Sequence, residues 1–190
     1  MSDGEVVKLR KTRNGVLTRE KTIPYIDRCV AVEIGDTCTS IGKTTFQEFK
    51  NLKEIKLGNN VNTIGSLAFF ASGISKIEFN ENLQSISLSS FAFCDNITEV
   101  DIPNSVKRIG DYAFFNCIKL EKVKLPNGIK KISQCVFLEC TSLIDVSIPN
   151  SVEEIGKRAF MGCESLTSIN IPSSVISIKE EAFRGTHIEK

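Results

Sequence analysis

The sequence has no tryptophan, a single histidine and no dominant charge of either sign. Its 190 residues include 24 lysines and arginines and 23 aspartates and glutamates, so the formal net charge is +1. A nucleic-acid-binding protein is expected to present a strongly basic surface, and this balance therefore argues against a nucleic-acid partner. The histidine, His187, lies on an expected turn and has no evident triad partner. We expect no enzyme, no cofactor and no metal site.

Long apolar runs are also absent. No stretch approaches the roughly 18 consecutive apolar residues of a membrane span, and residues 1–5 contain no apolar run typical of a secretory signal. The chain has seven cysteines, an odd number, and is too long for a small disulfide-stapled domain. Reduced thiols are therefore the better interpretation. These observations predict a soluble protein without membrane insertion, located in the cytoplasm, with the cell surface as the alternative.

What the chain does contain is an internal repeat. The stretch from Phe114 to the next equivalent phenylalanine, Phe137, carries apolar residues at irregular spacing and has a period of 23 residues. No single unit of this length can enclose its own apolar side chains, so each unit must stack on its neighbours. The sequence therefore predicts one continuous solenoid instead of one or two globular domains.

The repeat can be followed as columns of equivalent residues. The phenylalanine column reads Ile23, Phe46, Phe69, Phe91, Phe114, Phe137, Phe160 and Phe183. Two further columns, Val32, Ile55, Ile77, Val100, Val123, Val146, Ile169 and Ile34, Leu57, Phe79, Ile102, Leu125, Ile148, Ile171, are separated by one residue in every unit. This alternation predicts one short strand per unit. A turn, a second short extended segment such as 106–109, and a corner of about one helical turn or 3₁₀ complete each unit.

Residues 1–22 lie outside the repeat. Asn14-Gly15 is the dipeptide most favoured in two-residue hairpin turns, and it is flanked by the apolar segments 6–9 and 16–18. We therefore expect an N-terminal β-hairpin cap over residues 1–22, followed by a solenoid of about seven repeats of 22–23 residues over residues 23–190. A basic arm for nucleic acid or acidic lipid is the less favoured interpretation, because the positive charges in this segment are few.

Four cysteines, Cys94, Cys117, Cys140 and Cys163, occupy one column of the repeat. Equivalent residues of adjacent strands lie roughly 4.8 Å apart and point the same way, which is too far and too parallel for an unstrained disulfide. A zinc ion would need four thiolates around a point and not along a line. We interpret these cysteines as small apolar side chains that fill a narrow slot in the core.

The segment 102–120, Ile-Pro-Asn-Ser-Val-Lys-Arg-Ile-Gly-Asp-Tyr-Ala-Phe-Phe-Asn-Cys-Ile-Lys-Leu, resembles the BspA-type leucine-rich repeat family. The resemblance extends from Ile23 to Lys190 and departs at the N-terminal end, where Ile26, Cys29 and Gly35 replace the Cys, Leu and Pro of the pattern. It implies a β-rich α/β leucine-rich-repeat solenoid, right-handed, with a parallel sheet on the concave face and short helical turns or 3₁₀ on the other side. It also implies protein binding or adhesion.

The outward face of the expected strands carries charges of both signs. We name this set the charged face and choose it as the candidate partner-binding surface: Glu54, Lys56, Lys76, Glu78, Glu99, Asp101, Lys122, Lys124 and Asp145. As structure, cross-strand charge pairs stabilise a sheet by about 0.2–1 kcal/mol each and keep the register. As function, the same surface could dock a polar protein. The structural account is favoured, because strong interfaces normally offer aromatic anchors.

These observations together predict a protein–protein interaction scaffold without catalysis. A cell-surface or secreted adhesin that binds host or matrix proteins is the alternative. A second exposed patch consists of Lys107, Arg108, Lys130 and Lys131 on two adjacent units, followed by Glu153 and Glu154. Such charges would orient a partner, although a solvated edge is the favoured interpretation.

The C-terminal end of the array has no expected neighbour. By register Ile188 is equivalent to Ile74, so the expected strand from Ser168 to Ile171 has no successor to pair with. An unpaired edge over an apolar column is a template for association. We expect either a homodimer joined through this C-terminal edge or a piece of a longer array, and we favour the homodimer.

Overall fold

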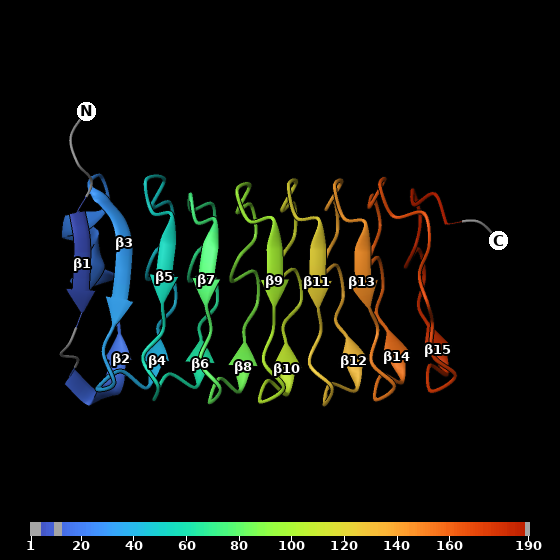
Figure 1. Ribbon diagram of the computed structural model, residues 1–190, viewed down its shortest axis with the longest axis horizontal. Helices are drawn as coiled ribbons and strands as arrows, with labels where there is room; N and C mark the ends of the chain where they lie inside the picture. Colours follow the sequence, from blue (N-terminus) through green and yellow to red (C-terminus); the bar gives the residue numbers. More distant parts are fainter. Residues whose placement is uncertain (1–4, 10–12, 189–190) are drawn as a thin grey trace.

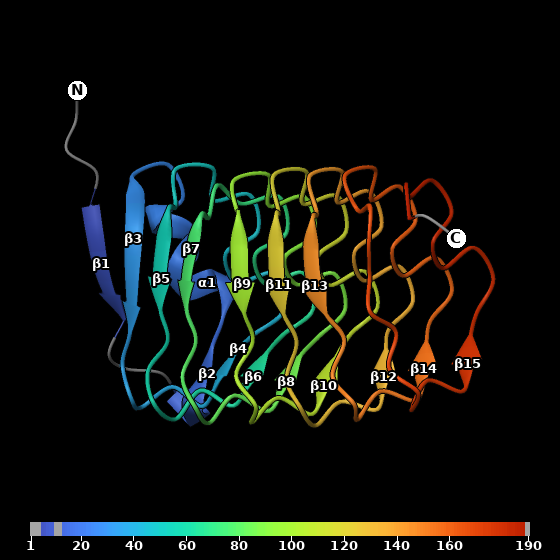
Figure 2. The ribbon, with the colours of Figure 1, turned by 45° about the vertical axis from the view of Figure 1, so that its right-hand side comes forward.

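A computed structural model describes residues 5–9 and 13–188 of the chain. The fold is a parallel-strand β-solenoid of about seven turns, as the repeat predicts, and the first and last described residues lie at opposite ends of it (Figure 1). We call each circuit of about 23 residues a rung. Most rungs add one strand to each of two sheets on different sides of the solenoid (Figure 2).

The main sheet contains the strands that the alternating columns predict. Its strands are β1 (Glu5–Leu9), β3 (Cys29–Ile34), β5 (Glu54–Lys56), β7 (Lys76–Glu78), β9 (Glu99–Asp101), β11 (Lys122–Lys124) and β13 (Asp145–Ser147). The paired strands are parallel, and equivalent residues of the repeat lie opposite one another, for example Val123 opposite Val100 and Val146. Their inward residues are apolar and their outward residues are exposed, as the period of two requires.

The second sheet is built from shorter strands. They are β2 (Val16–Leu17), β4 (Ser40–Ile41), β6 (Thr63–Ile64), β8 (Ser85–Ile86), β10 (Arg108–Ile109), β12 (Lys131–Ile132), β14 (Glu154–Ile155) and β15 (Ser177–Ile178). The isoleucine of each strand points inward and is buried from β4 to β14, whereas Ile178 in β15 is 51% exposed. The second sheet therefore covers the core along most of the solenoid.

The corner that carries the phenylalanine column forms a third ladder of hydrogen bonds between rungs. In one rung the N–H groups of Tyr112, Phe114 and Asn116 donate to the next rung at 3.0, 3.0 and 2.8 Å. Tyr112 and Asn116 have positive φ, and the corresponding residues of the other rungs do too. We call this the corner ladder. Among the described residues, regular helix is confined to α1 (Arg19–Thr22) and η2 (Ile23–Tyr25), and the short segment η1 (Arg13–Gly15) is irregular because Asn14 has a positive φ.

A stack of phenylalanine rings runs through the core beside the corner ladder. From Phe46 to Phe183, successive rings are nearly parallel, with centroids 5.0–5.8 Å apart. The rings from Phe46 to Phe160 are fully buried. Stacked rings repeat because equivalent residues of parallel rungs point the same way, so the ring of one rung removes the ring of the next from water.

The N-terminal segment does not form the expected hairpin. Asn14 and Gly15 do have the positive φ values, 62° and 75°, that a hairpin turn requires. However, β1 pairs in parallel with β3, and β2 pairs in parallel with β4, so the flanking segments enter different sheets. The reason is burial, because this arrangement places Val7 and Leu17 over the open end of the core. The described residues between Glu5 and Leu17 thus follow the path of a further rung.

The expected strand from Ser168 to Ile171 is also absent. Among the described residues β13 is the last strand of the main sheet, and β15 of the second sheet lies further along the chain. Ile169 is only half-buried and Ile171 is 38% exposed, so little burial holds this segment against β13. The C-terminal edge that we expected at residues 168–171 is therefore not a strand edge.

Each sheet is interrupted once, and the interruptions lie at different rungs. The main sheet is broken between β7 and β9, and the second sheet between β10 and β12. Both appear as wider spacings in Figure 1. The main-sheet break coincides with the one unit of 22 residues. It also coincides with Phe79, whose side chain is larger than the isoleucine or leucine at this position of other rungs. The corner ladder and the phenylalanine stack continue through both interruptions.

Candidate functional site

The charged face lies on the outside of the main sheet. All nine of its residues are exposed, because each stands next to an inward apolar residue in a strand. The residues of β5 and β7 line one shallow hollow of about 320 Å³, and those of β9, β11 and β13 line a second of about 320 Å³. The break between β7 and β9 therefore divides the charged face into two parts.

Ion pairs connect many residues of the charged face. Lys124 lies 3.0 Å from Asp101, and Lys122 lies 3.7 Å from Glu99, each across adjacent strands. Glu78 contacts both Lys76 at 3.3 Å and Lys56 at 4.0 Å. These side chains are about half exposed or more, so each pair contributes only about 0–1 kcal/mol. Their main effect is to hold the charges in fixed positions relative to one another.

The two ends of the charged face differ from the sequence expectation. Glu54 lies opposite Lys76, and Asp145 lies opposite Lys122, in the strand register. Neither carboxylate forms an ion pair within the described residues, because Lys76 turns to Glu78 and Lys122 to Glu99. The alternation of signs is therefore present in the register, and only part of it is realised as contacts.

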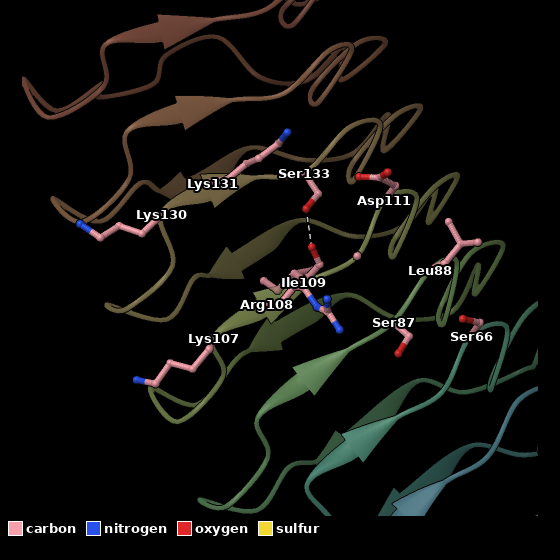
Figure 3. Close-up of a pocket in the computed structure, with 11 residues that line it drawn as sticks. Ser66, Ser87, Leu88, Lys107, Arg108, Ile109, Asp111, Lys130, Lys131 and Ser133 are labelled. Carbon is pink, nitrogen blue, oxygen red and sulfur yellow. Dashed lines mark hydrogen bonds between the residues drawn. The ribbon is translucent and has the colours of Figure 1, made fainter.

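A groove of about 570 Å³ lies at the break in the second sheet, between β10 and β12. We call it the basic groove and define it by Lys107, Arg108, Lys130, Lys131, Asp111 and Ser133, which line it with parts of the preceding rungs. Figure 3 shows the guanidinium of Arg108 turned towards Ser87 of the preceding rung, and the side chains of Lys107 and Lys130 extending to the opposite side. The sequence patch of four basic residues is thus gathered around one depression.

The backbone is open at the basic groove. In neighbouring rungs the residue before the strand donates its N–H to the rung below, as Lys107 does to Gln84 at 2.9 Å and Glu153 does to Lys130 at 2.9 Å. Within the described residues, no such bond joins Lys130 to Lys107. The next bond of the ladder is also replaced, because the hydroxyl of Ser133, and not its N–H, donates to the carbonyl of Ile109. The backbone hydrogen bonds that join other pairs of rungs at this position are therefore missing here.

The basic residues of the groove differ in their partners. Lys130 pairs with Glu153 at 2.6 Å, and Lys131 pairs with Glu154 at 2.8 Å. The hydrogen bond from Lys131 holds the pKa of Glu154 below its ordinary value. The side chain of Arg108 has no ion pair or hydrogen bond among the described residues, and the ammonium group of Lys107 reaches only the backbone carbonyl of Asn104, at 3.5 Å. Two cations therefore face the groove with no acidic partner.

The cysteine column is buried as expected. The thiols of Cys94, Cys117, Cys140 and Cys163 donate to phenylalanine carbonyls of the preceding rung at 3.0–3.2 Å. Burial raises the pKa of Cys94 and of Cys163 to about 12. All seven cysteines are free thiols. The described residues contain no group of metal-ligating side chains, and the ring of exposed His187 forms a hydrogen bond with the carbonyl oxygen of Glu164, at 2.5 Å.

No helix in the described part of the chain has the length and apolar character needed to cross a bilayer. The residues that sequence reasoning missed lie in the basic groove: Asp111, whose carboxylate accepts from the N–H of Gln134 at 3.1 Å, and Ser133. The signal that could have found the groove is the placement of two basic pairs at equivalent positions of adjacent units.

Comparison with known proteins gives a family match over most of the chain. The family model described as a BspA type leucine rich repeat region matches six copies, over residues 25–144 and 84–190. No curated protein sequence matches the chain. These segments together include every rung from β5 onward.

Two solved structures show the same fold. A leucine-rich repeat protein of T. pallidum is 28% identical, with a TM-score of 0.74, over 86% of this chain and 78% of that chain. The pneumococcal vaccine antigen PcpA is 20% identical, with a TM-score of 0.51, over 85% of this chain and 55% of PcpA. At this identity the second likeness shows the fold alone.

Proposed function

Because the chain belongs to the BspA-type leucine-rich repeat family, we propose that it is a protein–protein interaction scaffold without catalysis. Its partner binds through the charged face. The observation that supports this proposal is a sheet whose outward charges of both signs are spaced by the strand register and exposed together. Repeat solenoids use such extended surfaces for binding, because every rung adds one row of side chains at a fixed distance.

The charge pattern defines the kind of partner that fits. Lysines and carboxylates alternate between adjacent strands, and apolar anchors are absent from the nine positions. A partner must therefore be polar and must carry charges in the complementary order. Complementary charges of this kind favour the rate and specificity of association more than its strength.

The test is a partner pull-down with a charge-reversed variant. Lys76→Glu, Lys122→Glu and Lys124→Glu together change one cation in the first hollow and two in the second. A matched control reverses Lys21, Lys43 and Lys50, which are exposed and lie outside the strands. Loss of the same partners only in the first variant supports the proposal. Unchanged partners in that variant would show that the charged face is not the binding surface.

We also propose a cytoplasmic location. The seven free, buried thiols support it, since extracellular proteins commonly oxidise their cysteines to disulfides. The alternative, a cell-surface or secreted adhesin, predicts a different distribution. Fractionation of cells that express the full-length protein separates them: recovery from the soluble interior supports the cytoplasm, and protease-sensitive protein on intact cells supports the surface.

Self-association through the C-terminal face is a further part of the proposal. Ile176 is 84% exposed and Ile178 is 51% exposed, and both lie on the last rung that the structure describes. Sedimentation at micromolar concentration should show a dimer that Ile176→Glu with Ile178→Glu dissociates. Ile144→Glu is the control, because Ile144 is 50% exposed on another rung. A strict monomer before substitution would contradict this part.

A further inference from the structure

The second sheet changes its charge abruptly along the solenoid. The two residues that precede its buried isoleucine are uncharged on the early rungs, basic on two rungs and then acidic on one: Thr39 and Ser40, Asn62 and Thr63, Gln84 and Ser85, Lys107 and Arg108, Lys130 and Lys131, Glu153 and Glu154. In this series, only β10 and β12 are neighbouring strands that both carry charges of the same sign. The sheet is broken between these two strands.

Like charge accounts for the break better than shape does. Ser133 stands where several rungs have glycine, and a Cβ on Gly110 would lie 2.6 Å from the backbone of the rung below. A serine is nevertheless compatible with the ladder, because Ser87 donates its N–H to Ile64 at 2.9 Å. Basic pairs face each other only at the broken step. At the next step Lys131 lies opposite Glu154 and the ladder is intact.

The packing beneath the basic groove is also loosened. An apolar space too tight for a water molecule lies under it, lined by side chains that include Ile109, Ile132 and Phe137. The rungs are thus held together at the corner ladder and kept apart at the second sheet. A negative charge placed between the basic pairs would remove the repulsion that separates them.

We propose that the basic groove is a docking site for a short acidic segment of a partner protein, separate from the charged face. Carboxylates of the segment pair with Arg108 and Lys107, the two cations that have no acidic partner within the described residues. The N–H of Lys130, which has no acceptor in the rung below, is available to a carbonyl or carboxylate of the same segment. Arg108 supplies a planar fork of donors that matches a carboxylate.

The surroundings of the groove set the length of the ligand. Glu153 and Glu154 follow on the next rung and would repel a polyanion that continued along the sheet. On the other side the residues are uncharged. A volume of about 570 Å³ lies within the range of small-ligand sites and accommodates a few side chains. A nucleic acid or an anionic membrane would extend beyond the two basic rungs, so a short carboxylate cluster fits best.

The direct test is binding of a fluorescent hexaglutamate peptide to the full chain, measured by anisotropy. We expect saturable binding that weakens as salt is raised, and at least about tenfold weaker binding by Lys107→Glu with Arg108→Glu. Lys122→Glu with Lys124→Glu is the matched control, because it makes the same change of charge on the charged face. That control should bind the peptide as the unsubstituted protein does.

The same variant carries a second, opposite readout. Lys107→Glu with Arg108→Glu places carboxylates opposite Lys130 and Lys131, so it should raise the melting temperature by about 2–4 °C while it weakens binding of the peptide. Amide hydrogen exchange gives a local readout. The amide of Lys130 should exchange rapidly in the free protein and become protected with hexaglutamate, whereas the amide of Glu153 should change little.

Several outcomes would overturn the proposal. Equal binding of hexaglutamate by the groove variant and the unsubstituted protein would place the peptide elsewhere. Tighter, Arg108-dependent binding of a short DNA duplex or of phosphatidylserine vesicles would show that the groove takes a polyanion or a lipid surface. Because the control variant affects only the charged face, failure of the interaction-scaffold proposal and failure of this one are distinguishable.

Discussion

At the scale of single residues, four rungs are each joined to the preceding rung by a phenylalanine and a cysteine. The ring of Phe114 stacks between those of Phe91 and Phe137, at 5.3 and 5.8 Å. The carbonyl of Phe91 also accepts the thiol of Cys117 at 3.1 Å. A larger residue in place of the cysteine would have to displace this contact. The thiol is therefore small enough for the slot and polar enough to satisfy a buried carbonyl.

Phe114→Ala should lower the free energy of unfolding by about 3–5 kcal/mol, because it leaves a cavity between two rings that cannot close over it. Phe115→Ala is the control. Its ring is only half-buried, so less apolar surface is lost and the expected effect is about 1 kcal/mol. Urea denaturation followed by circular dichroism measures both. Similar losses for the two variants would mean that the stack contributes nothing beyond local contacts.

The buried thiols should make the protein less stable in alkali. Burial raises the pKa of Cys94 from 9.0 to about 12, so the folded state keeps a proton that the unfolded state loses. The contribution is present in full below pH 9 and decreases by about 1.4 kcal/mol per pH unit for each such thiol as pH rises towards 12. Denaturation midpoints at pH 8 and pH 10 test this.

The control for that experiment is Cys117→Ala with Cys140→Ala. Burial also raises the pKa of these two thiols well above its ordinary value, so their removal should make the dependence on pH shallower. All other ionisable groups are common to the two proteins, so the difference between them reports on the two thiols. An unchanged dependence on pH in the double variant would show that these thiols do not ionise on unfolding.

At the scale of elements, the one shortened unit depends on a glycine. A Cβ on Gly73 would lie 1.9 Å from the carbonyl oxygen of Lys50 in the rung below. Gly73→Ala should therefore destabilise by more than about 3 kcal/mol, because backbone must move. Gly128→Ala is the matched control, since its nearest neighbour is the flexible end of Lys107 at 3.1 Å. Thermal denaturation that ranked the two equally would contradict this explanation.

Much of the fold could be predicted from the sequence because the repeat makes burial visible. Columns such as Val100, Val123 and Val146 identified both the strands and their register. The turn conformation expected at Asn14-Gly15 was also confirmed, since both residues have positive φ. The expected hairpin was wrong because local turn geometry does not decide pairing. Each flanking segment pairs in parallel with a strand of the next rung and buries an apolar side chain there. This burial stabilises the fold more than pairing of the two segments with each other would.

The candidate sites were less predictable. Exposure of the charged face follows from alternation alone, whereas its binding role stays a prediction. The basic groove could not be derived from the columns, since they assume that every step between rungs is alike. Lys130 and Lys107 occupy equivalent positions, and only the loss of their backbone bond shows that the step differs. The sequence shows that like charges occupy equivalent positions of adjacent units, but it does not show that the second sheet is broken between them.

At the scale of the whole molecule, the two interruptions are staggered by one rung. The rung from β9 to β10 belongs to the C-terminal part of the main sheet and to the N-terminal part of the second sheet. No step therefore lacks both sheets, and the corner ladder crosses every step around the interruptions. The rung that starts at Glu99 joins the two halves of the solenoid, so the array is one continuous body despite its divided sheets.

The staggering has a mechanical consequence. If the molecule is pulled from its two ends in an optical trap, the force is carried by the main sheet on one side of the rung from β9 to β10 and by the second sheet on the other side. Within the described residues, no step between rungs lacks the hydrogen bonds of both sheets. The chain should lengthen in increments of about 75 Å, the extended length of one rung of roughly 23 residues. An initial split into two halves, recorded as one long extension, would contradict this. Under load, the rung from β9 to β10 would therefore hold the two halves together, because each break in one sheet is bridged by intact pairing in the other sheet.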